Sequence, residues 1–223
     1  MILAFNTGVK DRLDANRQNF RRSGNHIFAL NIFDGKKINA RQCIVKEISP
    51  REKQDFLTKF HLQGNDISSV FLGLFFEDQL VGVMTFSRPS RSRSSKQILK
   101  REGLWELNRY ATDYKYCVRG GAGKLLKYFM QHYDWSEIYS YADRRWSEGE
   151  MYKKLGFKLT SISKPNYWYV PKGYYKREYR YNYTKYKLIE AGHDKYKTET
   201  QIMQEKGYTR IWDCGMLKFV LKA

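Results

Sequence analysis

Two almost continuous apolar runs, rich in β-branched and aromatic residues, lie close together in the chain, at Val70 to Phe76 and at Leu80 to Phe86. The segment between them, Glu77-Asp78-Gln79, is short and polar, so the pattern predicts a β-hairpin. Strands that are apolar at nearly every position are typical of sheets covered on both faces. The chain is therefore expected to build its core around a covered sheet.

Helix signals lie on either side of this hairpin. Ser49-Pro50-Arg51-Glu52 combines an N-cap Ser, a Pro at the first helical position and a Glu that closes a capping box, and it predicts a helix to about Phe60. Apolar residues at helical spacing predict a second helix over Gly120 to His132. Because hairpins and helical crossovers alternate, we expect an α/β fold with a mixed central sheet flanked by helices. Further strands are expected at Cys43 to Ile48, Gly103 to Ala111, Ile138 to Ala142, Phe157 to Ile162 and Asn166 to Val170, with a short helix at Glu148 to Leu155.

The composition changes twice along the chain and suggests three regions. Residues 1 to 41 are polar, basic and poorly periodic, and we interpret them as an N-terminal arm or a small irregular subdomain. Residues 42 to 171 hold the expected α/β domain. Residues 172 to 223 are rich in Tyr, Lys and Arg and are interpreted as a small basic extension. It is expected to contain a helix at Thr198 to Lys206 and strands at Tyr208 to Trp212 and Met216 to Leu221, on either side of an Asp213-Cys214-Gly215 turn.

The net charge points to a polyanionic partner. The 223 residues include 41 Lys and Arg against 23 Asp and Glu, which gives a formal charge of +18. Nucleic acid is the first candidate, because basic residues that neutralise phosphates release condensed counterions. A merely basic, soluble protein is the alternative.

Cysteine and hydropathy patterns indicate a soluble, reduced, cytoplasmic protein without a membrane partner. Cys43, Cys117 and Cys214 are widely spaced and form no C-x-x-C pair. No apolar run approaches the length of a membrane span. No His and Cys pair has metal-ligand spacing and no paired carboxylates suggest a nuclease centre, so no metal site is expected.

A glycine-rich segment, Val118 to Leu126, lies between a predicted strand and a predicted helix. Its glycines leave backbone N–H groups free at a helix N-terminus, which is an arrangement that binds anions. It matches neither the P-loop pattern nor the dinucleotide pattern G-x-G-x-x-G. An ordinary glycine-rich helix start is the alternative.

Two motifs resemble the GCN5-related N-acetyltransferases (GNAT). The glycine-rich segment is similar to their R/Q-x-x-G-x-G/A pyrophosphate loop, and Met151 to Phe157 is similar to their closing motif of a short helix that turns through Gly into a strand. The resemblance implies acetyl-CoA or another acyl-CoA as cofactor, and Tyr152 as the general acid towards the coenzyme thiolate. Tyr152 could instead only pack beneath the sheet. The resemblance assigns cofactor binding to Arg119, Gly120, Gly121, Ala122, Gly123 and Lys124.

Four further segments resemble the Mom-like branch of this superfamily, phage proteins linked to an acyl-type modification of adenine in DNA. The resemblance implies DNA as partner and the cytoplasm of a phage-infected bacterium as location. The end of the chain, Gly207 to Gly215, also resembles segments of phage homing-endonuclease-like proteins. The four segments are Phe75 to Ser87, Glu106 to Arg109, Tyr141 to Asp143 and Asn166 to Tyr169.

Acyl transfer needs a base for the attacking amine as well as an acid for the thiolate. Glu106 is a candidate base because it lies in an apolar strand, where burial would raise its pKa. An ion pair with Arg109 or with an Arg of the Arg88 to Arg101 loop is the alternative. Asp143 is the second candidate, because it ends a strand where open α/β sheets place ligands. His61 and Ser87 are weaker candidates for substrate contact.

Two stretches of the chain are rich in Lys and Arg, and the second of them is also rich in Tyr. Arg88 to Arg101 is expected to be a cationic loop, and Tyr174 to Tyr186 interleaves six Tyr with Lys and Arg, which suits both bases and phosphates. The alternative for the second stretch is a half-buried strand whose Tyr face the core. If a base is flipped into the site, Trp146 or Trp168 could stack on it. The candidate nucleic-acid-binding residues are Arg88, Arg91, Arg93, Arg144, Arg145, Trp146, Lys176, Arg177 and Arg180.

Three hypotheses remain open at this point. The first is a DNA-directed N-acyltransferase that transfers an acyl group from acyl-coenzyme A to a base amine. The second is a non-catalytic module of the same fold that targets or protects DNA. The third, acylation of a protein or small amine, leaves the charge unexplained. The sequence specifies neither the acyl group nor the oligomeric state.

Overall fold

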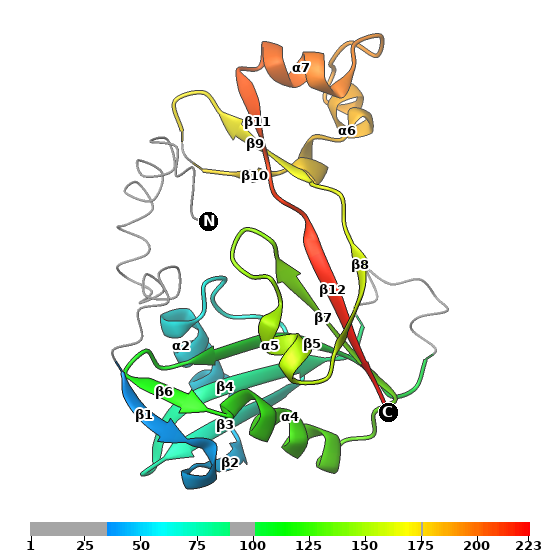
Figure 1. Cartoon of the computed structure of the whole chain (residues 1–223). Coiled ribbons are helices and arrows are strands. Elements are labelled where there is room, and N and C mark those ends of the chain that lie inside the picture. Colours follow the sequence, from blue (N-terminus) through cyan, green and yellow to red (C-terminus); the bar gives the residue numbers. More distant parts are fainter. Residues whose placement is uncertain (1–34, 90–100, 175) are drawn as a thin grey trace, which may run out of the picture. The chain divides into compact units, whose positions relative to one another are not determined.

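The computed structural model describes residues 35–89, 101–174 and 176–223, which form two compact units (Figure 1). The first unit contains the described residues up to Ala142, together with Glu148–Ser161 and Leu217–Ala223. The second unit contains Asp143–Ser147 and Ile162–Met216. In these described ranges, no helix has the length and apolarity needed to cross a membrane.

A seven-stranded mixed sheet forms the first unit, with the strand order β2-β3-β4-β5-β7-β12-β8. Strands β2 to β5 pair antiparallel, whereas β5 and β7 pair parallel. The expected mixed α/β fold is therefore confirmed, as is the hairpin of β3 and β4, in which Glu77 and Asp78 take positive φ angles of 49° and 60°. The strands are β2 (Ile44–Glu47), β3 (Val70–Phe76), β4 (Gln79–Ser87), β5 (Leu104–Thr112), β7 (Glu137–Asp143), β12 (Met216–Lys222) and β8 (Lys158–Ile162).

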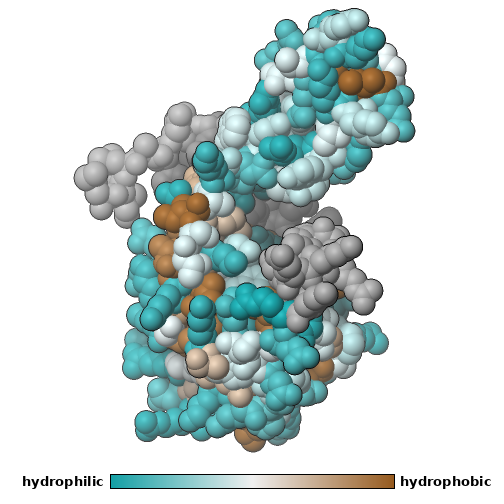
Figure 2. Space-filling view, turned by 90° about the vertical axis from the view of Figure 1, so that its right-hand side faces the viewer, coloured by the Kyte–Doolittle hydropathy of each residue, from teal (hydrophilic) through white to brown (hydrophobic). Residues whose placement is uncertain are grey.

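Helices α2 (Pro50–Phe60) and α4 (Gly121–His132) cover opposite faces of this sheet. Leu125 and Phe129 of α4 pack with Leu72 and Leu74, whereas α2 packs with Val83 in a separate cluster. This double coverage explains why β3 and β4 are apolar at almost every position. On the face that Figure 2 displays, most surface residues are hydrophilic. The expected capping box is confirmed at the start of α2, where the Ser49 and Glu52 side chains each accept a backbone N–H of the other residue.

Two short parallel strands, β1 (Lys36–Asn39) and β6 (Tyr116–Arg119), pair beside the main sheet, and a 3₁₀ turn, η2 (Ala40–Gln42), follows β1. The sequence did not predict this pair, because β1 is only four residues long and just Ile38 is buried. The described end of the expected N-terminal arm therefore pairs with β6 in the first unit. The rest of that arm lies outside the described residues.

The second unit is a three-stranded sheet with helices packed on it. Its strands are β10 (Glu178–Tyr179), β9 (Tyr167–Pro171) and β11 (Tyr208–Trp212), in the order β10-β9-β11. Tyr169 is the centre of its core, together with Leu188, Ile202 and Met203. The helical elements are η3 (Arg180–Tyr183), α6 (Lys185–Glu190) and α7 (Glu199–Glu205).

The division between the units does not follow the expected boundary after Pro171. Strand β9 was expected in the central sheet but belongs to the second unit, and the last strand, β12, belongs to the central sheet. The Asp213 carboxylate accepts N–H groups of Asn166 and Gly215, both at 2.8 Å, and Gly215 has a φ of 77°. Because β11 and β12 lie in different sheets, the turn at Asp213 does not close a hairpin.

Candidate functional site

Strands β5 and β7 pair over three residues and then separate. The register ends with Glu106 opposite Tyr139. Immediately beyond it, the Ser140 hydroxyl donates to the Leu107 carbonyl oxygen at 2.7 Å. Beyond Leu107, β5 continues to Thr112 in register with β4. We call this place, at Leu107 and Ser140, the strand fork.

A β-bulge lies beside the strand fork. Thr85 of β4 is opposite Arg109 and Phe86 is opposite Leu107, so Asn108 is an extra residue in β5. The Asn108 side-chain oxygen accepts from the Ser87 hydroxyl at 2.9 Å, and its backbone oxygen accepts from the Arg109 guanidinium at 2.8 Å. Bulges redirect side chains and are frequent next to active sites.

Tyr152 places its hydroxyl at the strand fork. It lies on the short helix α5 (Glu150–Lys154), and its hydroxyl is 2.9 Å from the Ser140 hydroxyl. Its ring stacks on Phe219, with centroids 5.1 Å apart. Burial raises the pKa of the Tyr152 phenol, although the Ser140 hydrogen bond and the charge of Arg109 act in the opposite direction. The phenol therefore keeps its proton at neutral pH and can act as an acid, while its ring also packs in the core.

Glu106 occupies the last paired position before the strand fork. It is half-buried, and its carboxylate accepts from the Tyr139 hydroxyl at 3.2 Å. On its other side, β4 places Ser87 opposite it. The Glu106 carboxylate therefore lies one residue before Leu107 of the strand fork and is hydrogen-bonded to Tyr139 of β7.

Helix α4 begins with the predicted glycines. Gly120 is its N-cap with a φ of 77°, which a residue with a side chain adopts only at a cost. A Cβ on Gly121 would lie 3.1 Å from the Tyr110 hydroxyl, whereas a Cβ on Gly123 would meet nothing closer than Leu155, at 3.6 Å. Gly121 is therefore needed for close packing, and Gly123 is the more open of the two.

Other residues of this loop are already engaged within the protein. The N–H of Ala122 donates to the Tyr110 phenol, whose pKa burial raises. The Lys124 ammonium donates to the carbonyl oxygens of Ala40, at 2.9 Å, and Cys43. Arg119 and Gly120 are exposed. The structure thus ties Lys124 to the turn after β1, a role that the sequence did not predict.

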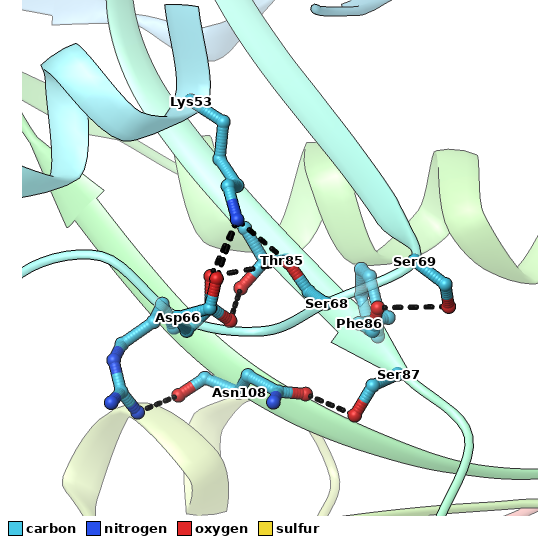
Figure 3. A network of polar contacts seen from close by, with 9 residues as sticks. Lys53, Asp66, Ser68, Ser69, Thr85, Phe86, Ser87 and Asn108 are labelled. Carbon is cyan, nitrogen blue, oxygen red and sulfur yellow. Dashed lines mark hydrogen bonds and ion pairs between the residues drawn. The ribbon is translucent and has the colours of Figure 1, made fainter. Parts of the chain in front are cut away.

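A buried ion pair lies on the α2 side of the sheet (Figure 3). The Lys53 ammonium contacts the Asp66 carboxylate at 3.2 Å and the Asp66 carbonyl oxygen at 2.6 Å, with the two side chains 6% and 4% exposed. The second carboxylate oxygen of Asp66 accepts from Thr85 at 2.8 Å, one strand away from Asn108. The sequence analysis missed this pair. Its signal was a Lys that lies one turn before Phe56 and Leu57, on the apolar face of α2.

His61 follows α2 and belongs to the same polar region. Its Nδ1 accepts the N–H of Gln63 at 3.1 Å. Burial, followed by the positive charge of Arg109, lowers the pKa of His61 to about 4, against the opposite effect of Asp66. The ring is therefore neutral at physiological pH, and the structure brings this weaker candidate into the electrostatic reach of Arg109 and Asp66.

The profile of the Mom protein family matches residues 42–215 of the chain. The chain belongs to the Mom protein family. The predicted resemblance to the Mom-like branch is thereby confirmed. No curated protein matches the sequence.

The solved structures to which this Mom family member is similar include acetyltransferases. A GNAT family acetyltransferase from Elizabethkingia anophelis with acetyl-CoA bound is 12% identical, with a TM-score of 0.44 over 82% of this chain and 99% of the other. An acetyltransferase from Bacillus subtilis in complex with CoA is 13% identical, with a TM-score of 0.41 over 82% and 98%. Ard1 from Thermoplasma volcanium is 12% identical, with a TM-score of 0.43 over 82% and 98%.

Asp143, the second candidate base, belongs to the second unit. Its carboxylate binds the Arg145 guanidinium in an ion pair. Partial burial raises the pKa of Asp143, but hydrogen bonds to Arg145 and the charges of Arg145 and Arg177 outweigh it, so that the pKa lies below its usual value. A carboxylate held in this way is a weak proton acceptor. Its contacts therefore favour a role in orienting Arg145.

The candidate nucleic-acid-binding residues lie in both units of this Mom family member. Arg88 lies over the Trp105 ring at 4.0 Å in the first unit. In the second, Arg144 donates to the Cys214 carbonyl oxygen at 3.0 Å, and Trp146 is 45% exposed. Arg91 and Arg93 lie outside the described residues.

The Tyr-rich stretch is not one half-buried strand, because among its described residues only Glu178–Tyr179 form a strand. Of its described tyrosines, Tyr174, Tyr179, Tyr181 and Tyr186 are exposed, and Tyr183 packs against the core. Its cations lie near rings or in solvent: Arg177 lies over Trp168 at 5.9 Å, Arg180 over Tyr167 at 4.6 Å, and Lys176 is exposed. In the described part of the chain, no group of three or more His, Cys, Asp and Glu could hold a metal ion.

Proposed function

We propose that this Mom family member is an N-acyltransferase that takes an acyl group from an acyl-coenzyme A and transfers it to a base amine of DNA, with adenine as the base that the family resemblance implies. The observation that carries the proposal is the Tyr152 hydroxyl at the strand fork, where Ser140 of β7 meets Leu107 of β5. An acid at the point where the pairing of two strands ends can serve a thioester that binds along the unpaired part of β5.

The donor fits the features beside the strand fork. Beyond Leu107, β5 has a backbone edge that faces away from β4, and an amide-containing extended chain such as the pantetheine arm can bind such an edge as an added strand. The start of α4 follows in sequence, and the N–H groups of its first turn attract phosphate. Gly121, Gly123 and Arg119 are the residues that would hold the pyrophosphate, whereas Lys124 would act by holding η2 in place.

The chemistry needs two proton transfers. The base amine attacks the thioester carbonyl carbon, a C–N bond forms, the C–S bond breaks, and coenzyme A leaves as a thiolate. Tyr152 gives its proton to that thiolate, which its raised pKa permits because the phenol is still protonated at neutral pH. Glu106, at the last paired position of β5, accepts the proton of the amine.

DNA as the acceptor accounts for the charge and the exposed rings. A net charge of +18 favours association with phosphates. Enzymes that act on a base amine inside a duplex extrude the base, and the extruded base is held by stacking. In the second unit, the exposed rings of Trp146, Tyr179 and Tyr181 can stack on bases of a DNA strand.

The test measures turnover and DNA affinity on the same variant. Tyr152→Phe removes one hydroxyl and keeps the ring that stacks on Phe219, so it should fold normally. We expect turnover to fall by roughly 10²- to 10⁴-fold, the usual effect of a positioned acid, while DNA affinity stays unchanged. Turnover is measured as modified nucleosides, by mass spectrometry, after incubation of DNA with acyl-coenzyme A. Tyr196→Phe, on a ring that is 85% exposed, is the matched control.

A second candidate function is the non-catalytic DNA-binding module. The engagement of Ala122 and Lys124 within the protein favours it, because both belong to the loop that would hold the cofactor. Full biological effect of Tyr152→Phe, or a wild-type protein that binds DNA but neither coenzyme A nor acyl-coenzyme A, would establish this second function in place of the first.

A further inference from the structure

The second unit contains a cavity between β11 and α7 that is separate from the strand fork. Its volume is about 300 Å³, at the lower end of the range for ligand pockets. It therefore has room for a small planar ring system and not for a whole cofactor. The residues that line it are Tyr169, Thr200, Gln204, Tyr208, Thr209, Arg210 and Trp212.

The aromatic part of the cavity is built by the strand register. Trp212 lies opposite Tyr167 and Arg210 opposite Tyr169, so these four side chains share one face of the three-stranded sheet. The Trp212 ring is tilted against the Tyr167 ring, with centroids 5.0 Å apart. Trp212 is nevertheless 56% exposed. A large ring at the edge of a cavity, supported from one side and open on the other, is suited to stacking against a flat ligand.

The polar part of the cavity is cationic. The Arg210 guanidinium lies over the Tyr167 ring at 4.8 Å and donates to the Thr200 hydroxyl. A guanidinium has five N–H donors, so this bond leaves others for a ligand. The nearby Glu199 carboxylate accepts instead from the hydroxyls of Tyr167 and Tyr169, at 2.7 and 2.8 Å. Among the residues that the structure describes, no carboxylate forms an ion pair with Arg210.

We propose that this cavity binds one unstacked nucleotide of a DNA strand, with its base against Trp212 and its phosphate or base edge at Arg210 and Gln204. A ring for stacking, a cation without an acidic partner and an amide are the groups that recognise a nucleotide. The proposal rests on the proposed function, because it takes DNA as the partner. It adds, in the second unit, a second place where the strand is held.

The experiment measures binding of the full chain to two labelled single strands by fluorescence anisotropy. One strand is oligodeoxyadenylate, and the other is a strand of the same length made of abasic nucleotides. Trp212→Ala should weaken binding of the first strand by about 5- to 150-fold, the value of one base stacked on an aromatic ring. It should leave the abasic strand unaffected, because that strand has no ring to stack. Trp212→Phe should recover most of the affinity.

Controls separate this proposal from its alternatives. Tyr196→Ala removes an exposed ring outside the cavity and should change neither affinity. Equal binding of the oligodeoxyadenylate by Trp212→Ala and wild type would overturn the proposal. It would leave the proposed function intact if the wild type still modified DNA. Free deoxyadenosine monophosphate that binds as tightly as the strand would assign the cavity to a free nucleotide and overturn the proposal too. A wild type that neither binds nor modifies DNA would overturn both.

Discussion

At the scale of single residues, His61 is held in its neutral form by its surroundings. It lies at the end of α2, where its Nδ1 accepts the Gln63 N–H. Because the accepting nitrogen carries no proton, the proton of the neutral ring is on Nε2. Burial and the charge of Arg109 lower the pKa of His61 from 6.5 to about 4. Protonation of this ring would therefore place a second positive charge beside Arg109.

This shift predicts a loss of stability in mild acid. Below pH 6.5 the unfolded chain takes up a proton that folded His61 does not accept until about pH 4, so the free energy of unfolding decreases over that window. The decrease is on the order of 3 kcal/mol, from the 1.4 kcal/mol that each pKa unit represents. Urea denaturation at several pH values measures it. His61→Asn retains an acceptor for the Gln63 N–H and should make the free energy of unfolding depend less steeply on pH between 6.5 and 4. The same pH dependence in wild type and variant would assign the acid sensitivity to other groups.

The positions of residues in the fold were predictable where the motif is local. The glycines before α4 and Tyr152 in α5 lie within short segments whose spacing already carries the information. Lys53 and Asp66 were not predictable as a pair, because their contact depends on how the chain returns from α2 to β3. The ion pair of Asp143 was not predictable for a related reason. Its partner Arg145 was visible two residues away, but only the geometry shows the ion pair.

At the scale of elements, the start of α4 decides whether the loop can serve a cofactor. Gly123→Glu is a sharper test than a change at Gly121, because a side chain at Gly121 would collide with Tyr110, Val118 and Leu74, whereas Gly123 has space. A carboxylate in the first turn of a helix favours the helix, so folding should be kept. We expect the affinity for coenzyme A to fall by at least about tenfold through repulsion of the pyrophosphate, since like charges at such distances cost more than 1.4 kcal/mol outside bulk water. Titration calorimetry measures this affinity.

Gly123→Gln is the matched control, because it has nearly the same size without the charge. It should lose less affinity than Gly123→Glu. Equal affinity of wild type and Gly123→Glu would exclude the first turn of α4 as the place where the pyrophosphate binds.

Elements with local signals were predicted well, and those that depend on distant partners were not. The capping box of α2, the hairpin of β3 and β4, and α4 agree with the sequence analysis. The pattern also indicated β11 and β12 as strands, but it could not tell which sheet each joins. Apolar alternation specifies a strand and leaves its neighbours open. In the structure β12 lies between β7 and β8, and its Phe219 is buried in the main core.

At the scale of the whole molecule, charge dominates the expected association with DNA. The formal charge of the full chain is +18, and its cations include the exposed Lys176 of the second unit. Non-specific binding to phosphates supplies affinity without information about bases, and base contacts such as the one proposed at Trp212 add preference.

This charge predicts a steep dependence of DNA affinity on salt. The logarithm of the binding constant should fall linearly with the logarithm of the salt concentration, with a slope of about −0.9 for each phosphate contacted in duplex DNA. Fluorescence anisotropy at several salt concentrations gives the slope. The double change of Lys176 and Arg177 to Gln should make it shallower, whereas Trp212→Phe should not alter it. A DNA affinity that does not depend on the salt concentration would show that contacts with DNA phosphates do not contribute to binding.

Strands β8 and β12 are neighbours in the sheet, and nearly all of the second unit is inserted into the chain between them. The ends of the insertion are close, because the N–H of Ser163 donates to the Met216 carbonyl oxygen at 2.9 Å. A short turn could therefore bridge β8 and β12 directly and leave the strand order of the main sheet unchanged. In genetic terms, the second unit behaves as an exchangeable cassette. A lineage could replace this unit in one recombination step and keep the main sheet.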